Sequence, residues 1–438
     1  MCYTYFINKN RRLLKMLTAI VGINWGDEGK GRIVDLLSET QNIVVRYQGG
    51  NNAGHTVVND SGKYILNLLP SGILRPDVTC VMGLGMVIDL THLTREIGAL
   101  REKGISITPA NLKISDKAVL TLPYHVALDK FEEARLAGEN YGSTQKGIAP
   151  AYGDKYMKKA IRMGELANID SLIQRLEKIV EFKNLTLENV YHADKIDFAE
   201  LTALVKQYKA DFSDYVCDTT KYLLAAEKDG KNIMFEAQLG ALRDIDFGIY
   251  PYTSSSSTIS AYAPIGAGIP GSRIDRCIGI MKAYSSCVGN GPFTVEMGGD
   301  DAAALREAGH EYGAATGRPR RVGAFDVVAS RYGVTVQRAD EIAFTKLDIL
   351  SYMDKIPVCV AYEVNGHITE DFPMNQDLEN AKPIYEYLDG WNCDVSACRE
   401  KSDLPANAIK YIDYIQAKVG CKITLVSVGA ERDAYLMY

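Results

Sequence analysis

The sequence lacks the patterns that mark membrane-spanning, secreted and zinc-binding proteins. No apolar run reaches the roughly 20 residues that a bilayer-spanning helix needs. The nine cysteines include no C-x-x-C pair, and no histidine spacing suggests zinc, so they are most simply the reduced thiols of a cytoplasmic protein. Residues 1–15 are basic and lack the apolar core of a secretory signal, and we interpret them as a disordered extension.

The sequence also lacks an excess of positive charge. Its formal net charge is −6, which argues against nucleic acid as the main partner. Hydrophobic residues make up 47% of the chain and charged residues 24%, as in ordinary globular proteins. With 438 residues, the chain is long enough for one large α/β domain or two ordinary ones.

The segment 22–32 is the most informative part of the sequence. An apolar run over 17–21 predicts a strand before it, and the apolar spacing over 33–37 predicts a helix after it. A strand, a glycine loop and a helix together present backbone N–H groups to phosphate. The alternative is a tight turn, but a turn needs one or two glycines, and this segment has four together with Lys30.

This loop departs at two positions from the phosphate-loop pattern G-x-x-x-x-G-K-[ST]. Asn24 stands where the first glycine is expected, and Gly31 stands where a serine or threonine would bind the metal. The metal-ligand role must therefore fall on another residue, and Asp27 is the obvious carboxylate.

Polar loops follow other predicted strands. The strand over 42–47 ends in a loop rich in glycine and asparagine that contains His55; a lone histidine is more often structural, but these neighbours favour a ligand site. A glycine and hydroxyl loop over 141–150 precedes the basic residues of 155–162, which form either a solvated helix face or an anion site. The hydroxyl run over 253–258 is either a flexible linker or a ligand loop, and its surroundings favour the ligand loop.

The glycines of 266–271 match G-x-G-x-x-G formally, but they do not predict a dinucleotide site. Pro270 interrupts the helix that should begin there, and the residues after it, over 277–284, predict a strand. The segment 169–229 predicts amphipathic helices and carries no chemistry that we recognise.

Two late segments have the composition of ligand sites. Three arginines within 318–321 suit a carboxylate or a phosphate, although a solvated surface is the alternative. A predicted strand from 342 ends in Lys346 and Asp348, a pair that can read guanine: the carboxylate accepts from the ring N–H and amino groups, and the lysine stem covers the ring. A last strand and turn are predicted over 425–429.

Strands that end in polar glycine loops and alternate with helices predict an α/β fold with a mostly parallel sheet and all the loops on one edge. These loops would supply a phosphate-binding site, a carboxylate, a histidine, a second anion-binding site and a guanine-binding site. The pattern therefore predicts nucleotide-dependent group transfer.

Taken together, the loops at 26–32, 49–56, 316–321, 345–348 and 427–429 resemble those of the adenylosuccinate synthetase family, in the same order, from about Thr18 to Arg432. The resemblance implies one α/β domain over 16–438, related to phosphate-loop NTPases and working as a homodimer. It implies the GTP-dependent ligation of L-aspartate to IMP through a 6-phosphoryl-IMP intermediate, with Mg²⁺, giving adenylosuccinate, GDP and phosphate.

The resemblance also implies roles for individual residues. Asp27 would take the N1 proton of IMP, Asp27 and the Gly54 carbonyl would hold Mg²⁺, and the catalytic set would be Asp27, Lys30, His55 and Gln238. GTP would contact Gly26, Asp27, Glu28, Gly29, Lys30, Gly31, Arg32, Gly54, His55, Thr56, Arg320, Lys346, Leu347, Asp348, Ser427, Val428 and Gly429. IMP would contact Asn52, Ala53, Thr144, Lys158, Gln238, Ser254 and Arg318. Aspartate would contact Val288, Ala315, Thr316, Gly317, Arg318 and Arg320.

The sequence departs from the family mainly around the acceptor purine. Lys158 replaces an arginine that reaches across the dimer to the IMP phosphate, and lysine lacks the bidentate fork. Gln238 is displaced by one position, so either the backbone adjusts or Leu239 faces the purine. Further replacements of family residues are Lys146 and Cys287 for arginine and Ala315 for threonine.

These departures keep two alternatives open. The same chemistry could act on a different purine nucleotide, such as one resembling dGMP. The chain could instead be a GTP-binding regulator without synthetase activity, although Asp27, His55 and the arginine loop argue against a pure switch.

Overall fold

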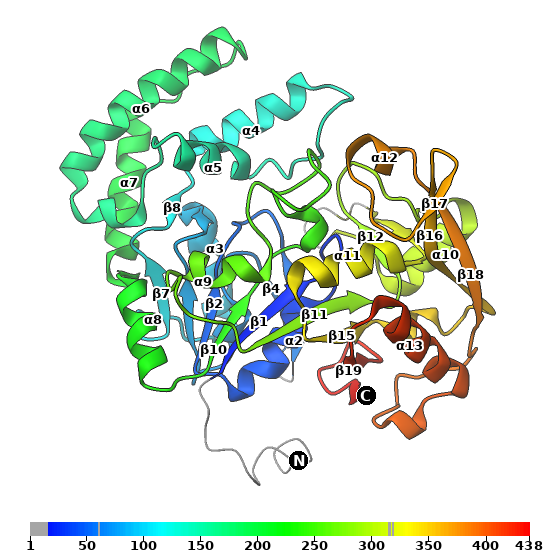
Figure 1. Ribbon diagram of the computed structural model, residues 1–438. Helices are drawn as coiled ribbons and strands as arrows, with labels where there is room; N and C mark the ends of the chain where they lie inside the picture. Colours follow the sequence, from blue (N-terminus) through cyan, green and yellow to red (C-terminus); the bar gives the residue numbers. More distant parts are fainter. Residues whose placement is uncertain (1–15, 60–61, 314–316, 318) are drawn as a thin grey trace.

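The computed structural model describes residues 16–59, 62–313, 317 and 319–438 (Figure 1). The predicted extension 1–15 and the predicted ligand residues Ala315, Thr316 and Arg318 lie outside the described residues.

A ten-stranded sheet forms the centre of the structure, in the order β20-β19-β15-β11-β1-β10-β2-β5-β7-β9. All neighbouring strands in it are parallel except β19 and β20. The strands are β1 (Leu17–Gly22), β2 (Ile43–Arg46), β5 (Thr79–Met82), β7 (Leu112–Ser115), β9 (Val216–Cys217), β10 (Ile233–Glu236), β11 (Arg276–Lys282), β15 (Glu341–Thr345), β19 (Ile423–Ser427) and β20 (Tyr435–Met437). The predicted α/β class with a mostly parallel sheet is confirmed.

The central strands are buried on both faces, which explains their nearly continuous apolar sequences. In β1, Ala19 and Val21 face one core cluster, and Ile20 between them faces another, as the alternation of a strand requires. Apolar residues on both faces need cover from helices on both faces, and Figure 1 shows helices packed on each side of the sheet.

The helices that cover the sheet and extend from it are α2 (Lys30–Leu37), α3 (Leu90–Glu102), α4 (Pro123–Arg135), α5 (Ile148–Tyr156), α6 (Ile169–Asn189), α7 (Phe198–Phe212), α8 (Thr219–Lys228), α9 (Ala263–Ala267), α10 (Gly299–Gly309), α11 (Val327–Gln337), α12 (Asn375–Glu379) and α13 (Ala406–Val419). In Figure 1, α4 to α7 lie on one side of the molecule and α12 lies on the opposite side. Among the described residues, no helix has the length and apolar character needed to cross a membrane.

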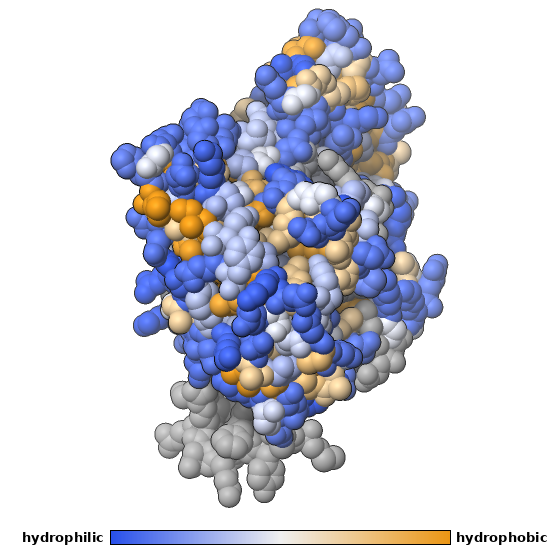
Figure 2. All heavy atoms as spheres, turned by 90° about the vertical axis from the view of Figure 1, so that its right-hand side faces the viewer, coloured by the Kyte–Doolittle hydropathy of each residue, from blue (hydrophilic) through white to orange (hydrophobic). Residues whose placement is uncertain are grey.

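A smaller sheet lies beside α12 and contains β14 (Phe325–Asp326), β16 (Lys355–Val364), β17 (His367–Thr369) and β18 (Lys382–Asp389). Short two-stranded pairs join β3 (His55–Asn59) to β4 (Gly62–Leu66), β6 (Val87–Ile88) to β8 (Val119–Leu120), and β12 (Ser285–Cys287) to β13 (Arg321–Gly323). The face that carries β16 to β18 is mostly hydrophilic, with small separate apolar patches (Figure 2).

One local prediction is wrong. The strand over 425–429 is not the last one, because the chain turns back and adds β20 antiparallel to it. Of the two alternatives for the hydroxyl run, the flexible linker is excluded, because Ser256 and Thr258 are buried and bonded to Gln48 and Asp244.

The rejection of a dinucleotide site at 266–271 agrees with the structure. Gly266 lies in the short helix α9, and Gly268 and Gly271 follow it and precede β11, whereas the fingerprint follows a strand and opens a helix. The single domain over 16–438 stays a prediction, although β1 and β20, near the two ends of the described chain, lie in one sheet.

Candidate active site

The carboxyl ends of neighbouring parallel strands bring the predicted ligand loops together. The strands β15, β11, β1, β10 and β2 are consecutive in the sheet, and the loop after each of them carries predicted site residues. Because parallel strands end on the same edge, Lys346, Asp27, Gln238 and Asn52 share that edge although the sequence separates them widely.

The phosphate loop after β1 is shaped by an internal carboxylate. Glu28 is 1% exposed, and its side chain accepts the N–H groups of Asn24 at 3.1 Å and Gly26 at 2.8 Å. It also accepts the Nζ of Lys30 at 2.5 Å. The N–H groups of residues 27–30 have no acceptor in the part of the chain that the structure describes, which leaves them available to an anion.

Gly31 has a steric explanation that the sequence could not provide. A Cβ atom at this position would lie 2.1 Å from Cδ2 of His55, so only glycine permits the imidazole to lie against the first turn of α2. The residue that replaces the hydroxyl of the phosphate-loop pattern therefore makes room for the predicted catalytic histidine. The two loops are one site.

His55 is held by a buried relay that was not predicted. Its Nε2 lies 2.8 Å from Oγ of Ser71, and Ser71 donates both its hydroxyl and its N–H to Glu236, each at 2.7 Å. Because the single hydroxyl proton of Ser71 is committed to Glu236, the Nε2–H of His55 must be the donor to Ser71. Burial, together with the positive charges of Arg46 and Lys30, lowers the pKa of His55 to about 3, so the imidazole is neutral at physiological pH.

A second buried carboxylate, Glu311, connects the predicted aspartate residue Arg320 with the predicted guanine residue Lys346. Its oxygens accept Nζ of Lys282 at 2.7 Å, Nζ of Lys346 at 2.8 Å and a guanidinium N–H of Arg320 at 2.8 Å. Burial alone would raise the pKa of Glu311, but these three cations together lower it well below its usual range. Burial lowers the pKa of Lys282 to about 8.

Arg320 also contacts the predicted base. Its Nε lies 3.1 Å from Oδ2 of Asp27, so one guanidinium bridges Asp27 and Glu311. Asp27 has a φ of 57°, and its side chain keeps 27% of its surface exposed, in contrast to the buried Glu28 beside it.

One of the predicted guanine residues, Asp348, has an unsatisfied acceptor. Oδ1 of Asp348 is buried and has no hydrogen-bond partner in the described structure, and burial raises the pKa of this carboxyl. A buried carboxylate oxygen without a donor is what a ring N–H and an amino group would satisfy. Lys346 lies close by in the sequence with its Nζ on Glu311, whereas the side chain of Leu347 is fully buried in the core.

Arg32 fixes the other guanine segment to the phosphate loop. From the first turn of α2, its guanidinium donates to Oγ of Ser427 at 2.5 Å and to the carbonyls of Gly429, Glu431 and Ala434. The side chain is therefore committed to the loop after β19 and holds that loop against α2.

Comparisons with known proteins agree with this geometry. The sequence profile of the adenylosuccinate synthetase family matches residues 19–436. The chain belongs to the adenylosuccinate synthetase family.

Individual relatives cover almost the whole chain. Adenylosuccinate synthetase of Caldanaerobacter subterraneus subsp. tengcongensis is 45% identical over 418 residues, which are 95% of this chain and 98% of the relative. Adenylosuccinate synthetase 2 of Pseudoalteromonas translucida is 44% identical over 95% of this chain and 99% of its own length. The structure of fully ligated adenylosuccinate synthetase from Plasmodium falciparum has a TM-score of 0.90 at 34% identity, covering 96% of this chain and 99% of that one.

A more distant structure shares only the fold. The succinoaminodeoxyadenylate synthetase of cyanophage S-2L, solved with dGMP and dATP, has a TM-score of 0.61 at 19% identity. The predicted resemblance to the adenylosuccinate synthetase family is thus confirmed.

The displaced glutamine contacts the loop after β2. Gln238 is buried; Nε2 donates to the carbonyl of Gly50 at 3.1 Å, and Oε1 accepts the N–H of Gly50 at 3.2 Å. Nε2 also lies 3.4 Å from the carbonyl of Ala53, a predicted IMP residue. The next residue, Leu239, has a φ of 63°, a conformation that a leucine rarely adopts. Which of the two side chains faces the purine stays a prediction.

The remaining predicted IMP and aspartate residues lie on exposed or half-buried loops. Thr144 and Lys158 are exposed, Ser254 is bonded to Ser256, and the side chain of Val288 is 48% exposed. Lys158 follows α5 with a φ of 62°.

The predicted Mg²⁺ ligands suit that ion in their chemistry. Mg²⁺ prefers a carboxylate or two together with phosphate oxygens and water. Asp27 offers a partly exposed carboxylate, and the Gly54 carbonyl has no hydrogen-bond donor among the residues that the structure describes. No group of three or more His, Cys, Asp or Glu residues that could hold a metal occurs in the described structure, so protein side chains alone do not build a cage.

The sequence reasoning missed Ser71, Glu236, Glu311 and Arg243, the last of which contacts the loop of Val288. Glu236 comes at the end of an apolar run, that of β10, and could have been suspected on that ground. Glu311 could not, because its partners come from separate segments of the chain.

Proposed function

We propose that this chain joins L-aspartate to IMP at the expense of GTP, giving adenylosuccinate, GDP and phosphate. Family membership over nearly the whole chain supports this activity. The observation that carries it is the packing of His55 against Gly31 in the phosphate loop that also presents Asp27, because this places a base and a neutral hydrogen-bond donor at one anion site.

In this reaction Asp27 takes the N1 proton of IMP, which makes O6 a nucleophile toward the γ-phosphate of GTP. Lys30 and the free N–H groups of 27–30 bind the phosphates. His55 donates its Nε2–H to the transferred phosphoryl group, for which it must exchange Ser71 for a phosphate oxygen. Mg²⁺, held by Asp27 and the Gly54 carbonyl, would neutralise charge on the phosphates.

The amine of aspartate then displaces phosphate from C6 of the intermediate. Arg320, which bridges Asp27 and Glu311, receives a carboxylate of aspartate. Substrate aspartate therefore competes with Asp27 for the guanidinium and frees the base for its proton. Thr316 and Arg318, from the same loop, complete the grip on aspartate.

Guanine is read by Asp348, whose buried and unsatisfied oxygen accepts from the ring N–H and amino groups. Lys346, Ser427 and Gly429 line the same site. IMP lies along Asn52, Thr144, Gln238 and Ser254.

The active unit is a homodimer in which Lys158 reaches the IMP phosphate of the partner subunit. Lys158 lies in an exposed segment with Tyr156, which is 74% exposed, and Met157, which is 57% exposed. Large exposed apolar side chains beside an exposed lysine suit a contact between two copies. The cytoplasmic location stays a prediction.

The alternative of a different purine acceptor is not favoured. Gln238 keeps its place beside Asn52 and Ala53 in spite of its displacement in the sequence. A non-catalytic regulator is also disfavoured, because the bridge from Asp27 through Arg320 to Glu311 has no use in a switch that only binds GTP.

One assay tests the proposal. Phosphate release from GTP is measured with the purified protein while IMP or aspartate is omitted in turn. We expect release only when both are present. Release with another purine nucleotide but not with IMP would support the altered acceptor, and slow release independent of both would support the regulator.

A further inference from the structure

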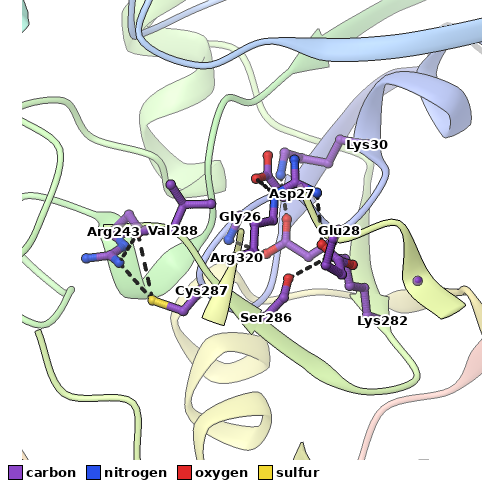
Figure 3. Close-up of polar contacts among 12 residues, drawn as sticks. Gly26, Asp27, Glu28, Lys30, Arg243, Lys282, Ser286, Cys287, Val288 and Arg320 are labelled. Atoms are coloured by element: carbon purple, nitrogen blue, oxygen red, sulfur yellow. Dashed lines mark hydrogen bonds and ion pairs between the residues drawn. The ribbon is translucent and has the colours of Figure 1, made fainter. Parts of the chain in front are cut away.

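Arg243 is a buried cation without a carboxylate partner. It ends the short helix η5 (Ala241–Arg243) that follows Gln238, and it is 7% exposed. Its guanidinium donates to the carbonyl of Val288 at 2.5 Å, to Sγ of Cys287 at 3.0 Å and to the carbonyl of Tyr252 (Figure 3). Every hydrogen-bond acceptor of this guanidinium in the described structure is neutral, and it forms no ion pair there.

A buried charge of this kind is normally paired, because taking an ion out of water costs several kcal/mol. Carbonyl dipoles offset part of that cost but do not neutralise the charge. An anion bound nearby would gain from the attraction of the guanidinium.

Arg243 also orients the backbone at Val288. In a trans peptide the C=O and N–H point in opposite directions, so holding the Val288 carbonyl toward Arg243 turns the N–H of Gly289 away from it. The N–H groups of Val288, Gly289 and Asn290 have no acceptor among the described residues, and Gly289 has a φ of 85°. Consecutive N–H groups without acceptors form an anion-binding nest.

The nest lies next to Arg320, which is proposed to receive a carboxylate of aspartate. Cys287 pairs with Arg321 in the antiparallel β12–β13 pair. The next residue beyond this pair is Val288 on one segment and Arg320 on the other, so the two lie side by side. Arg320 contacts Asp27 at 3.1 Å, so the nest, Arg320 and the proposed base lie close together.

Arg243 connects this nest with the proposed IMP loop as well. Its own carbonyl accepts the N–H of Ser254 at 2.9 Å, while its side chain holds Tyr252 on one side and Val288 on the other. One residue therefore sets the position of the hydroxyl loop relative to the nest.

We propose that Arg243 is a positioning residue for the aspartate substrate: it holds the 288–290 nest open and supplies the positive charge that favours a carboxylate there. The inference rests on the proposed function and deepens it, because it adds Arg243, which belongs to none of the predicted ligand sets, as the residue that positions the predicted aspartate contact at Val288.

The test compares Michaelis constants for the three substrates in Arg243→Leu. Losing a charge-assisted hydrogen bond costs about 1.5–3 kcal/mol, so we expect the KM for aspartate to rise about 10- to 100-fold. The KM for GTP should stay within about twofold, because Arg243 contacts no residue proposed to bind GTP. Arg243→Lys keeps the charge but loses the several N–H donors of the planar guanidinium. It should raise the KM for aspartate less than Arg243→Leu does.

Arg101→Leu is the matched control, because Arg101 also donates to a backbone carbonyl, that of Ile107, and to a hydroxyl, that of Tyr215. We expect no change in the three constants for this control.

Equal increases in all three constants for Arg243→Leu would indicate a general structural role and overturn the inference, as would an unchanged KM for aspartate. If Arg243→Leu does not fold, Arg243→Lys and Arg243→Gln replace it in the test. A wild-type KM for aspartate in both of these variants would overturn the inference. Failure of the proposed function is distinguishable, because the wild-type protein itself would then release phosphate without aspartate, or would not release it with IMP, before any variant is compared.

Discussion

At the scale of single residues, the site depends on two carboxylates with opposite surroundings. Asp27 and Glu28 are adjacent, but Glu28 is buried and bonded to three donors of its own loop, whereas Asp27 is partly exposed and contacts only Arg320 among the described residues. Their environments give one residue a structural role and leave the other free for chemistry.

Replacing Asp27 by asparagine should abolish turnover while GTP binding is largely retained. The amide cannot take the N1 proton of IMP, but the N–H groups of the loop remain in place. Phosphate release and equilibrium binding of GTP are the two measurements. Asp116→Asn, which removes a charge paired with Lys117 on another loop, is the control. An active Asp27→Asn variant would remove Asp27 as the base.

Gly31→Ala should lower kcat by roughly 100-fold, because a displacement of about 1 Å at a reacting group can cost that much. The new Cβ would lie 2.1 Å from the ring of His55 and must push it out of place. Gly98→Ala is the control: this glycine lies inside α3 with no atom within 4 Å of the added Cβ. Steady-state kinetics of both variants decide the point, and a fully active Gly31→Ala protein would contradict the assigned packing.

Which residues the sequence could predict depends on whether neighbours along the chain reveal them. Asp27, Lys30 and His55 stand in glycine loops at strand ends, and such loops are visible in the sequence. Glu311 and Arg243 are recognisable only through partners from distant segments, so no local pattern exists for them. At Leu239 the sequence left two alternatives open, because a left-handed φ at a leucine cannot be seen in the sequence.

At the scale of elements, strands with continuous apolar sequences were the reliable part of the prediction. The strands β1, β2 and β11 were expected within about two residues of their bounds, whereas the strand predicted from 342 was extended to Asp348 although β15 ends at Thr345. The small sheet was not expected, because β16 and β18 mix apolar and exposed polar residues without a clear period. Short edge strands such as β20 carry too few residues to show a pattern.

The N-cap of helix α11 is a buried carboxyl group whose ionisation destabilises the folded protein at neutral pH. Asp326 caps the helix by accepting the N–H of Ala329 at 3.0 Å, and burial raises the pKa of Asp326 to about 6. Since the folded pKa exceeds the unfolded value, the group favours folding when protonated, and this contribution is lost as the pH rises from about 4 through 6.

Asp326→Asn should therefore raise the free energy of unfolding at pH 7 by about 1–3 kcal/mol, because asparagine caps helices equally well without a charge. The difference between variant and wild type should shrink toward zero below pH 4. Urea unfolding at several pH values between 4 and 8 measures it. A variant that is less stable than wild type at pH 7 would contradict the argument.

At the scale of the whole molecule, the proposed homodimer allows a test by complementation. Asp27→Asn and Lys158→Ala should each be inactive or nearly so. If Lys158 serves the partner's site, mixed dimers contain one site with both residues intact, and an equal mixture should regain about a quarter of wild-type activity. Mixing after partial unfolding and refolding, followed by phosphate-release assays, measures the recovery. A mixture no more active than its components would place Lys158 in its own subunit's site or outside any site.

The anchoring of Arg32 has a consequence for nucleotide length. One end of α2 carries the amides proposed to receive phosphates, and Arg32 on the same turn holds the segment proposed to contact the base. If both proposals hold, α2 and Arg32 set the distance between the two ends of a bound nucleotide, rather than two independent loops. A nucleotide that is one phosphate shorter would then leave the proposed reacting position next to His55 empty.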